Sequence, residues 1–569
     1  MDMRVTAAQR VREALTLAFP QAEAAADFER LLEVPPEPQM GDLAFPCFQL
    51  AKSLRMGPPQ IAAKLAEHID VPGVLRAEVK GGYLNFFFDR EHLARQVLQA
   101  VLAAPESWGG GDEGKGKTVC IDYSSINIAK RFHIGHLSTT MLGHSLKRIY
   151  DTLGYATVGI NHLGDWGTQF GKMIAAYLHW GTKEQVEQGG VQALSDLYVR
   201  FHQESAQDPS LEDEGRQWFK RIEDGDEEAL RIFNWFKDLT LKDAARVYDL
   251  LGVTFDSYAG ESFYNDKMDR VIDELREKNL LTESDGAWVV DLEPYGMPPC
   301  LILKSDGATL YATRDLAAAL YRKDTYDFDK NLYVVAYQQD LHFRQVFKVL
   351  ELMGYEWAKD QMEHVAFGMI SYEGESLSTR KGNTVYLDEL LDKAQEKALA
   401  IMEEKSPDLE GKEDIARQVG VGSVVFFDLF NSRIKDIDFR WDRALNFDGE
   451  TGPYVQYTHA RCDSVLRKGE EVTAAPDWSA LTDDEALQLV KLLAQFPDAV
   501  REAAGRNEPS IVTRATTEIA KAYNKYYYEH RILTEDEAQS AARLALTRAA
   551  QACIRRGLWL IGIEAPVKM

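Results

Sequence analysis

Two histidines spaced three residues apart, His133 and His136, are the strongest sign of chemistry in the sequence. They stand at the predicted start of a helix, where unpaired backbone N–H groups and the positive end of the helix dipole favour phosphate. Side chains at i and i+3 share a helix face, so both imidazoles can donate hydrogen bonds to one triphosphate, and Gly135 lets a nucleotide approach the backbone. Such a pair could stabilise charge on an α-phosphate under attack. The alternative is a helix start that carries two histidines by chance.

The residues around these histidines predict a strand, a helix and a second strand. Residues 118–123 are apolar and β-prone, residues 134–153 carry apolar side chains at helical spacing before Gly154, and residues 157–161 form another β-prone run. The order recurs with a strand at 332–336, a helix at 341–353 and a strand-like run at 364–370. We therefore expect a doubly wound parallel sheet with ligands beyond the carboxyl ends of its strands.

Composition narrows the class of protein. The chain has 569 residues, 45% of them hydrophobic and 27% charged, which is typical of a globular protein with several domains. No apolar run is long enough for a membrane span and the first residues lack a secretory h-region, so we expect a cytoplasmic protein. The five cysteines lie far apart, without zinc-ligand spacing, so no metal site is expected on the protein.

The net charge of −25 argues against nucleic acid as a partner, because phosphate binding depends on Lys and Arg. Between residues 491 and 556, however, Lys and Arg outnumber Asp and Glu, so one segment could still face an RNA.

Three domains are predicted. A linker rich in glycine and charge, residues 106–117, ends an N-terminal α+β domain at residues 1–112. The sheet-forming region at 113–410 is predicted as a catalytic domain, with a helical insertion at about 183–270 whose aromatic side chains we interpret as core. Residues 411–569 have a helical pattern almost throughout and predict an α-helical bundle.

Five longer blocks make the chain resemble one known family. They are DYSSINIAKRFHIGH at 122–136, NHLGDWGTQFG at 161–171, YATRDL at 311–316, YQQDLHF at 337–343 and DGETGPYVQYTHAR at 448–461. HIGH at 133–136 is a signature of class I aminoacyl-tRNA synthetases, and the blocks together are similar to the arginyl-tRNA synthetases of that class. The resemblance implies an α/β protein with a Rossmann-type catalytic domain, an N-terminal α+β domain that binds the tRNA elbow and a C-terminal all-α anticodon-binding domain.

The resemblance also implies a reaction and its partners. L-arginine and ATP, with Mg²⁺ on the phosphates, would give arginyl-adenylate, and arginine would then pass to the 3′-terminal adenosine of tRNA(Arg). The family usually needs bound tRNA for productive activation. We expect a monomer that has no membrane partner and no editing domain.

Substrate choice also has a physical basis. A guanidinium carries a fixed charge and a planar fork of donors, so its pocket needs a carboxylate and neutral acceptors. Asp315 lies one helical turn after Tyr311, and the two side chains can share a face. By resemblance, Tyr311, Asp315 and Gln339 bind the arginine side chain. The other positions that match the family's arginine site are Asp122, Ser124, Asn127 and His136. A surface charge or an ion pair with Arg314 is the plain alternative for Asp315.

The second signature of the class, a lysine-bearing loop, is altered in this chain. Residues 376–383 read SLSTRKGN, with Thr379 where the usual second lysine stands. The ATP-binding positions implied by the resemblance are His133, Gly135, His136, Ser378 and Lys381, and the catalytic ones are His133, His136, Lys130, Arg380 and Lys381. Which of Lys130, Arg380 and Lys381 replaces the missing lysine stays open, and we hypothesise that Lys130 does so in part.

Contacts with tRNA are predicted in two segments. RNA loops are recognised by aromatic stacking and by hydrogen bonds to base edges. The family match assigns this role to Tyr83 and Asn85 near the N-terminus, and to Asn446, Tyr454, Gln456, Tyr457, His459 and Arg461 later in the chain. Ordinary strand alternation at 83–88 would account equally well for the first pair.

Three other functions are weighed against this one. A class I synthetase of another specificity is weakened by the absent zinc ligands of a cysteine enzyme and by acidic residues that would repel an anionic substrate. A non-catalytic synthetase-like RNA-binding protein is disfavoured by the intact histidines. A small nucleotidyltransferase would leave both flanking domains without a role.

Overall fold

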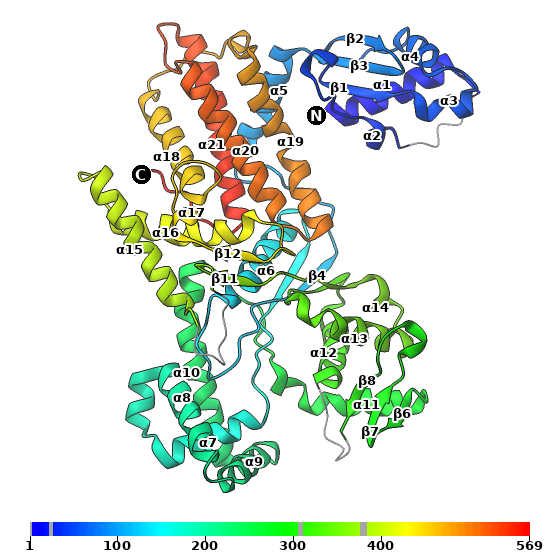
Figure 1. The fold of residues 1–569 in the computed structure, drawn as a ribbon. Coiled ribbons are helices and arrows are strands. Elements are labelled where there is room, and N and C mark those ends of the chain that lie inside the picture. Colours follow the sequence, from blue (N-terminus) through cyan, green and yellow to red (C-terminus); the bar gives the residue numbers. More distant parts are fainter. Residues whose placement is uncertain (1–2, 22–26, 305–310, 376–383) are drawn as a thin grey trace. The chain divides into compact units, whose positions relative to one another are not determined.

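The computed structural model describes residues 3–21, 27–304, 311–375 and 384–569 (Figure 1). The chain divides into two compact units. The first unit comprises Met1–Trp108, Arg461–Phe496 and Glu518–Ile554, and the second comprises Gly109–Ala460, Pro497–Thr517 and Arg555–Met569. The division passes through four long helices, α18 (Gly452–Lys468), α19 (Asp484–Arg506), α20 (Ser510–Glu529) and α21 (Glu537–Leu560). Among the described residues, no helix is long and apolar enough to cross a membrane.

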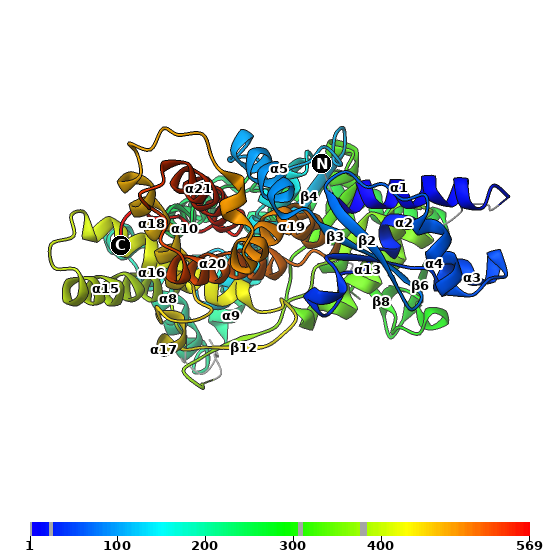
Figure 2. The same cartoon turned by 90° about the horizontal axis from the view of Figure 1, so that it is seen from above.

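The first unit contains a small antiparallel sheet covered by helices (Figure 2). Its strand order is β1-β3-β2, with β1 at Leu43–Pro46, β2 at Val74–Lys80 and β3 at Tyr83–Phe88. Helices α1 (Met3–Ala18) and α4 (Pro58–Ala66) contribute to the same buried core as β1 and β3. The expected N-terminal α+β fold is confirmed. The remaining helices of this region are α2 (Phe28–Leu31), α3 (Phe48–Leu54) and α5 (Arg90–Ala103).

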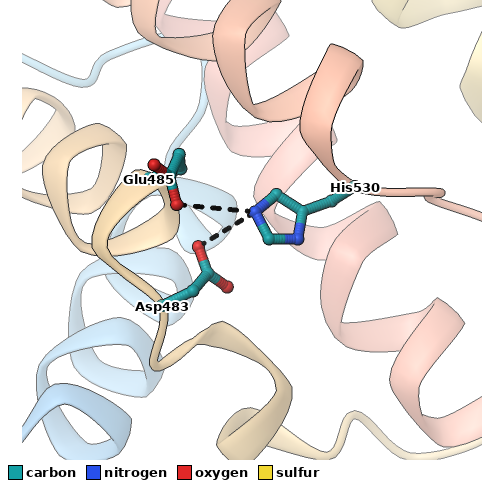
Figure 3. Close-up of side chains that lie close together, drawn as sticks. All are labelled: Asp483, Glu485 and His530. Atoms are coloured by element: carbon teal, nitrogen blue, oxygen red, sulfur yellow. Dashed lines mark ion pairs between the residues drawn. The ribbon is translucent and has the colours of Figure 1, made fainter.

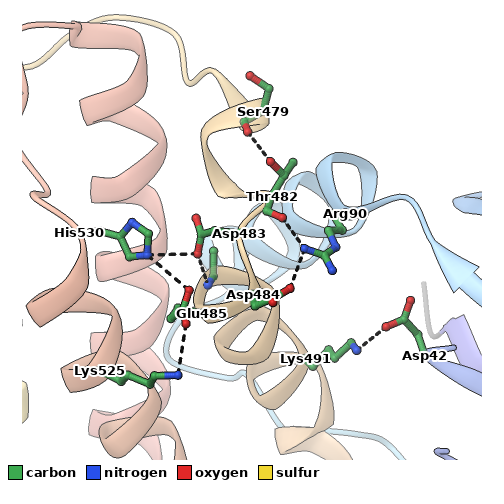
Figure 4. A network of polar contacts seen from close by, with 11 residues as sticks. Asp42, Arg90, Ser479, Thr482, Asp483, Asp484, Glu485, Lys491, Lys525 and His530 are labelled. Atoms are coloured by element: carbon green, nitrogen blue, oxygen red, sulfur yellow. Dashed lines mark hydrogen bonds and ion pairs between the residues drawn. The ribbon is translucent and has the colours of Figure 1, made fainter. Parts of the chain in front are cut away.

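Charged contacts organise the helical part of the first unit (Figure 4). Asp483 accepts a hydrogen bond from the backbone of Ala486 and so caps the start of α19. Arg90 pairs with Asp484 at 2.9 Å, and Lys491 pairs with Asp42 beside the small sheet.

A four-stranded parallel sheet forms the centre of the second unit. Its strand order is β10-β9-β4-β5, with β4 at Thr118–Asp122, β5 at Ala156–Ile160, β9 at Lys330–Tyr333 and β10 at Met362–His364. Strand β4 pairs with β5 on one side and β9 on the other, so the strand order reverses there, which is where this architecture binds ligands. The doubly wound sheet is confirmed, with each strand within a few residues of its predicted position.

Helix α6 (Gly135–Thr152) connects β4 to β5 and packs very close to the sheet. A Cβ atom at Gly143 would lie 2.2 Å from Cβ of Tyr123, so only glycine allows this approach. Helix α12 (Tyr311–Tyr326) precedes β9, and α13 (Asp340–Leu352) connects β9 towards β10 through the short helix α14 (Trp357–Asp360).

The connection between β5 and β9 is long. It begins with α7 (Thr168–Trp180), α8 (Lys183–Ser205), α9 (Ser210–Glu223) and α10 (Glu227–Leu251), which gather in one cluster in Figure 1. The expected helices at 183–270 are present, and Thr182 and Asp226 cap two of them. A three-stranded antiparallel sheet follows that the sequence pattern did not reveal. Its strands are β6 (Leu281–Ser284), β7 (Ala287–Val290) and β8 (Cys300–Leu303), beside α11 (Met268–Glu277).

The rest of the second unit is mostly helical, and its helices after residue 411 lie in the region that the sequence predicts to be helical. It includes α15 (Leu387–Lys405), α16 (Lys412–Phe430) and α17 (Trp441–Ala444). Two short strands, β11 (Ile370–Tyr372) and β12 (Ile437–Phe439), pair in parallel.

Candidate active site

The carboxyl end of β4 carries a buried ion pair. Asp122 ends the strand, and one of its oxygens accepts a hydrogen bond from Arg322 of α12 at 2.7 Å. Its other oxygen accepts one from the Ser125 hydroxyl at 2.8 Å. Arg322 is fully buried, so the negative charge of Asp122 is balanced inside the protein. This carboxylate is therefore already engaged before any substrate arrives.

The turn after β4 has unusual backbone geometry and a dense hydrogen-bond network. Ser124 has a φ of 69° and Ser125 one of 47°, values that are uncommon for residues other than glycine and that cluster at functional sites. The buried hydroxyl of Ser124 lies 2.8 Å from the phenol of Tyr248 and accepts a hydrogen bond from Thr140. Asn161, at the end of β5, donates to the same phenol at 2.8 Å. Tyr248, which lies on α10, thereby ties the helical insertion to the site.

The two signature histidines lie where the sequence predicts, at the N-terminus of α6. Their ring centroids are 3.9 Å apart. The backbone N–H of Gly135 donates to Nδ1 of His133, and the backbone N–H of His133 donates to Nδ1 of His136, each at 3.2 Å. Because both Nδ1 atoms accept, each neutral ring carries its proton on Nε2. A Cβ atom at Gly135 would lie 2.9 Å from Cε1 of His133, so this glycine permits the packing of the two rings.

Burial keeps both imidazoles neutral. It lowers the pKa of His136 to about 3, with smaller contributions from His133 and from the positive charge of Lys130. Burial and then Lys130 also lower the pKa of His133. Near neutral pH the rings therefore act as N–H donors without charge, and the exposed Lys130 supplies the local cation. The two imidazoles can therefore stabilise negative charge on a phosphate through their N–H dipoles, but not through a positive charge of their own.

The segment that follows residue 383 is bound to the loop before α6. His133 pairs with Tyr386 in an isolated antiparallel bridge, and the guanidinium of Arg131 lies 3.6 Å from the ring centre of Tyr386. Arg131 also donates to both carboxylate oxygens of Asp388 at 3.0 Å. The three predicted residues of the second signature, Ser378, Arg380 and Lys381, lie outside the described residues.

Asp315 lies partly buried on α12, one turn after the first residue of the helix, and its carboxylate is 2.5 Å from Nε2 of His342. Burial alone would raise its pKa, but the hydrogen bond and positive charge of His342, with His162 and Arg322 further away, lower it. Tyr311, one turn earlier, is 64% exposed. Gln339 is also exposed, in a short 3-10 helix after β9.

A second carboxylate lies near Asp315. Burial raises the pKa of Glu261 to about 7, against the attraction of Arg314 at 4.0 Å and with the repulsion of Asp315 and Asp165. Asp165 itself is fully buried and accepts hydrogen bonds from Lys237 at 2.6 Å and from Ser262. A group of acids with one member close to half-protonated is suited to receive a cation.

Sequence reasoning missed Arg322, Tyr248, His342 and Glu261. His342 is part of the family-like block YQQDLHF at 337–343, so the sequence did offer a signal for this polar partner of Asp315. Arg322 lies in an ordinary helical context, where the sequence offers no sign of a partner 200 residues away, and the local sequence around Glu261 likewise gives no sign of its burial.

The predicted RNA-contacting residues differ in how far their side chains are buried. Asn85 is buried in β3, and the Tyr83 ring lies 5.2 Å from that of Phe48. Gln456 is fully buried and donates to the backbone oxygens of Gln418 and Glu564.

The other predicted positions lie in or near α18. His459 is buried within hydrogen-bond distance of a backbone oxygen, whereas Asn446 and Tyr457 are exposed and Tyr454 is half-buried. In the first unit, the Arg461 guanidinium lies 5.2 Å and 5.3 Å from the ring centres of Tyr527 and Tyr528.

One cluster in the described part of the chain has metal-ligand chemistry (Figure 3). Nε2 of His530 lies 3.3 Å from Asp483 and 3.7 Å from Glu485. Asp483 already caps α19, and Glu485 also pairs with Lys525 at 3.2 Å. The cluster therefore has a sufficient explanation as an ion-pair contact between the start of α19 and the end of α20.

Three family descriptions match consecutive parts of the chain. They are "tRNA synthetases class I (R), catalytic domain" at residues 97–441, "DALR anticodon binding domain" at 455–569 and "Arginyl tRNA synthetase N terminal domain" at 6–88.

Curated relatives and solved structures agree with these matches. A protein of Alkaliphilus metalliredigens called arginine–tRNA ligase is 54% identical, over 95% of each chain, and one of Clostridium perfringens with the same name is 52% identical over 100% of each. The Thermus thermophilus arginyl-tRNA synthetase structure has a TM-score of 0.83 at 28% identity, covering 99% of this chain and 100% of that one. A Plasmodium falciparum arginyl-tRNA synthetase structure shares the fold, with a TM-score of 0.79 at 20% identity over 100% and 99% of the two chains.

Proposed function

This chain belongs to the arginyl-tRNA synthetase family, and from that premise we propose which of its residues perform the ligation of arginine to tRNA. In the first step the carboxylate of L-arginine attacks the α-phosphate of ATP, forming arginyl-adenylate and releasing pyrophosphate. In the second step a hydroxyl of the 3′-terminal adenosine of tRNA(Arg) attacks the activated carbonyl and releases AMP. Neither step requires a nucleophile from the enzyme, so positioning and electrostatics supply the acceleration.

The observation that supports this assignment most is the protonation pattern of the two imidazoles. With Nδ1 of both rings occupied by backbone N–H groups, Nε2–H of His133 and of His136 is free to donate to phosphate oxygens. The N-terminus of α6, with Gly135 as its first residue, adds a positive dipole end at the same place, although the backbone N–H groups of Gly135, His136 and Leu137 are already bonded within the protein. Donors that are already oriented cost no reorganisation when charge develops.

Cations for the leaving pyrophosphate come from Lys130 and from the loop that carries Ser378, Arg380 and Lys381. Lys130 is exposed and close enough to lower the pKa of both histidines. Mg²⁺ would be held by the ATP phosphates, because the carboxylate at this strand end, Asp122, is already bonded to Arg322 and Ser125.

For the arginine substrate we propose a side-chain pocket of Asp315, Tyr311 and Gln339, extended by Glu261. His342 holds the Asp315 carboxylate, and burial raises the pKa of the nearby Glu261 carboxylate although Arg314 lies 4.0 Å away, so a bound guanidinium would favour its ionised form.

The α-amino and backbone groups of arginine are assigned to residues after β4. Asn127 is exposed there, whereas Asp122 and Ser124 are buried and already hydrogen-bonded, and His136 completes the assigned set.

Contacts with tRNA are proposed at exposed or half-buried positions of the predicted set. These are Tyr83, Asn446, Tyr454, Tyr457 and Arg461, whereas Asn85, Gln456 and His459 would act by supporting their segments. We further propose a monomer that acts in the cytoplasm, with domains at residues 1–112, 113–410 and 411–569.

Aminoacylation with arginine and with its neutral isostere citrulline tests the proposal. The wild-type protein should charge tRNA(Arg) with arginine and reject citrulline by about 10⁴-fold or more in kcat/KM, because a buried carboxylate would face an uncharged urea. Asp315→Asn should lose most of the arginine activity while Asp291→Asn, an exposed change elsewhere in the second unit, should not. Equal use of both amino acids, or an unaffected Asp315→Asn variant, would overturn the assignment of the pocket.

A further inference from the structure

A cavity of about 430 Å³ lies in the second unit beside the far half of α6. Its walls include Arg148 of α6, Gly252 at the end of α10, Gln418 of α16, and Trp559 with the segment 562–567 that follows α21. Arg148 comes 12 residues after His136, roughly 18 Å along the helix axis. The cavity is therefore separate from the candidate active site.

Arg148 of the cavity wall is a cation that contacts a backbone oxygen and an aromatic ring. Its guanidinium donates to the backbone oxygen of Trp559 and lies 4.8 Å from the centre of that ring. Over the ranges 3–21, 27–304, 311–375 and 384–569, no carboxylate forms an ion pair with it. Burial, together with the like charge of Arg556, lowers the pKa of Arg148 to about 10. A desolvated guanidinium of this kind is stabilised when an anion binds beside it.

The other charged residues around the cavity add to the excess of positive charge that Arg148 creates. Arg555 also lines the wall. The carboxylate of Glu564 is neutralised, because both of its oxygens bond to Arg417, at 2.5 Å and 3.0 Å. Asp249 is the remaining acid among the lining residues, and it is exposed to solvent. The field inside the cavity is thus positive in a chain whose net charge is −25.

An unsatisfied buried histidine lies behind the same wall. His144, one turn before Arg148, is 5% exposed, and within the described part of the chain neither of its ring nitrogens has a hydrogen-bond partner. It lies against Gly562 of the cavity wall, since a Cβ atom at Gly562 would come within 3.2 Å of its ring. Buried polar groups are nearly always satisfied, so an orphaned imidazole behind the wall of a cavity that two arginines line indicates a missing partner.

We propose that this cavity binds a small phosphate-type oxyanion, with Arg148 as its principal ligand and Arg555 as a secondary donor. The planar guanidinium fork matches two oxygens of a tetrahedral oxyanion. The volume accommodates a single phosphate or pyrophosphate with water, and the neighbouring Trp559 reports on occupancy. The site would be a second anion site near the opposite end of α6, the helix whose N-terminus carries the two signature histidines.

Fluorine NMR of the full chain tests this directly. The enzyme is labelled with 5-fluorotryptophan, and Trp559→Phe identifies the resonance of Trp559. Inorganic phosphate and pyrophosphate are then titrated at constant ionic strength against sodium chloride. The Trp559 resonance should shift saturably, and Arg148→Met should weaken the apparent affinity at least tenfold. Arg148→Lys, which keeps the charge without the fork, should fall between the two.

Arg231→Met is the matched control, because Arg231 is an exposed arginine on α10 away from the cavity wall. It should titrate like the wild type. A Trp559 resonance that does not shift, or that shifts equally in Arg148→Met, would overturn the proposal. So would a resonance that responds to tRNA but not to free phosphate or pyrophosphate, since the anion would then belong to RNA.

Discussion

The guanidinium of Arg322 donates to the carboxylate of Asp122 across 2.7 Å, with the arginine fully enclosed by protein. The pair joins α12 to the carboxyl end of β4, at the point where the strand order of the sheet reverses. A charge in such a place is tolerated only while its partner remains.

Arg322→Met should therefore destabilise the second unit by about 3–5 kcal/mol, because Asp122 would be left buried and uncompensated. The double variant Arg322→Met/Asp122→Asn should recover part of that loss. Urea unfolding measures both. Equal stability of the single variant and the wild type would show that the pair contributes nothing to folding.

Two substitutions of His136 distinguish the roles of its two ring nitrogens. His136→Gln can keep a donor near the position of Nε2, whereas His136→Asn keeps only a group near Nδ1. We expect kcat of aminoacylation to fall by about 10²–10³-fold for the Asn variant and by less for the Gln variant. Because burial lowers the pKa of His136 to about 3, wild-type kcat should show no inflection from this residue between pH 5 and 8. Identical losses in the two variants would contradict a donor role for Nε2.

A substitution of Lys130 tests whether this residue supplies the positive charge of the missing signature lysine. Lys130→Met should lower tRNA-dependent exchange of pyrophosphate with ATP by about 10–100-fold, since it removes a positive charge near the phosphates. Lys242→Met, an exposed change on α10, serves as the control and should leave exchange unchanged. If Lys130→Met behaves like this control, the charge comes from residues 380 and 381 alone.

Arginine binding should depend on pH through Glu261. Its pKa is raised to about 7, so the carboxylate is largely protonated below that pH, and a cationic substrate favours the ionised form. The Kd of arginine should rise as pH falls from 8 to 5.5, by up to about tenfold per unit below pH 7. Asp315 does not contribute in this window because its pKa is lowered from its ordinary value.

Equilibrium dialysis with labelled arginine measures this dependence. Glu261→Gln should bind more weakly at pH 8 and lose the pH dependence, while Glu283→Gln, on the exposed strand β6, should retain it. A flat profile in the wild type would remove Glu261 from the pocket.

Asp483 has two roles that substitutions can separate. Asp483→Ala should cost about 1 kcal/mol of stability through loss of the cap on α19. Asp483→Asn keeps the cap but removes the charge facing His530, so its thermal unfolding should lie closer to that of the wild type. Equal losses for Asn and Ala would make the ion pair, which both substitutions remove, the dominant contribution.

Local patterns in the sequence were enough to predict much of this protein. The apolar runs and the helical spacing between them predicted the parallel sheet, α6 with its histidines at the N-terminus, and the helical C-terminal region. These features depend on neighbours within a few residues, and periodicity and helix-end chemistry record such neighbours directly.

Tertiary structure alone decided which charges meet. Arg322 and Asp122 are 200 residues apart in the chain, Asp388 and Arg131 are 257 apart, and the antiparallel sheet β6-β7-β8 consists of four-residue strands too short to leave a clear pattern. Whether a carboxylate is free, paired or protonated depends on burial and on partners from distant segments, and neither is encoded in local spacing. For that reason the sequence predicted where the histidines stand, whereas the structure decided that they are neutral donors and that Asp122 is already bonded.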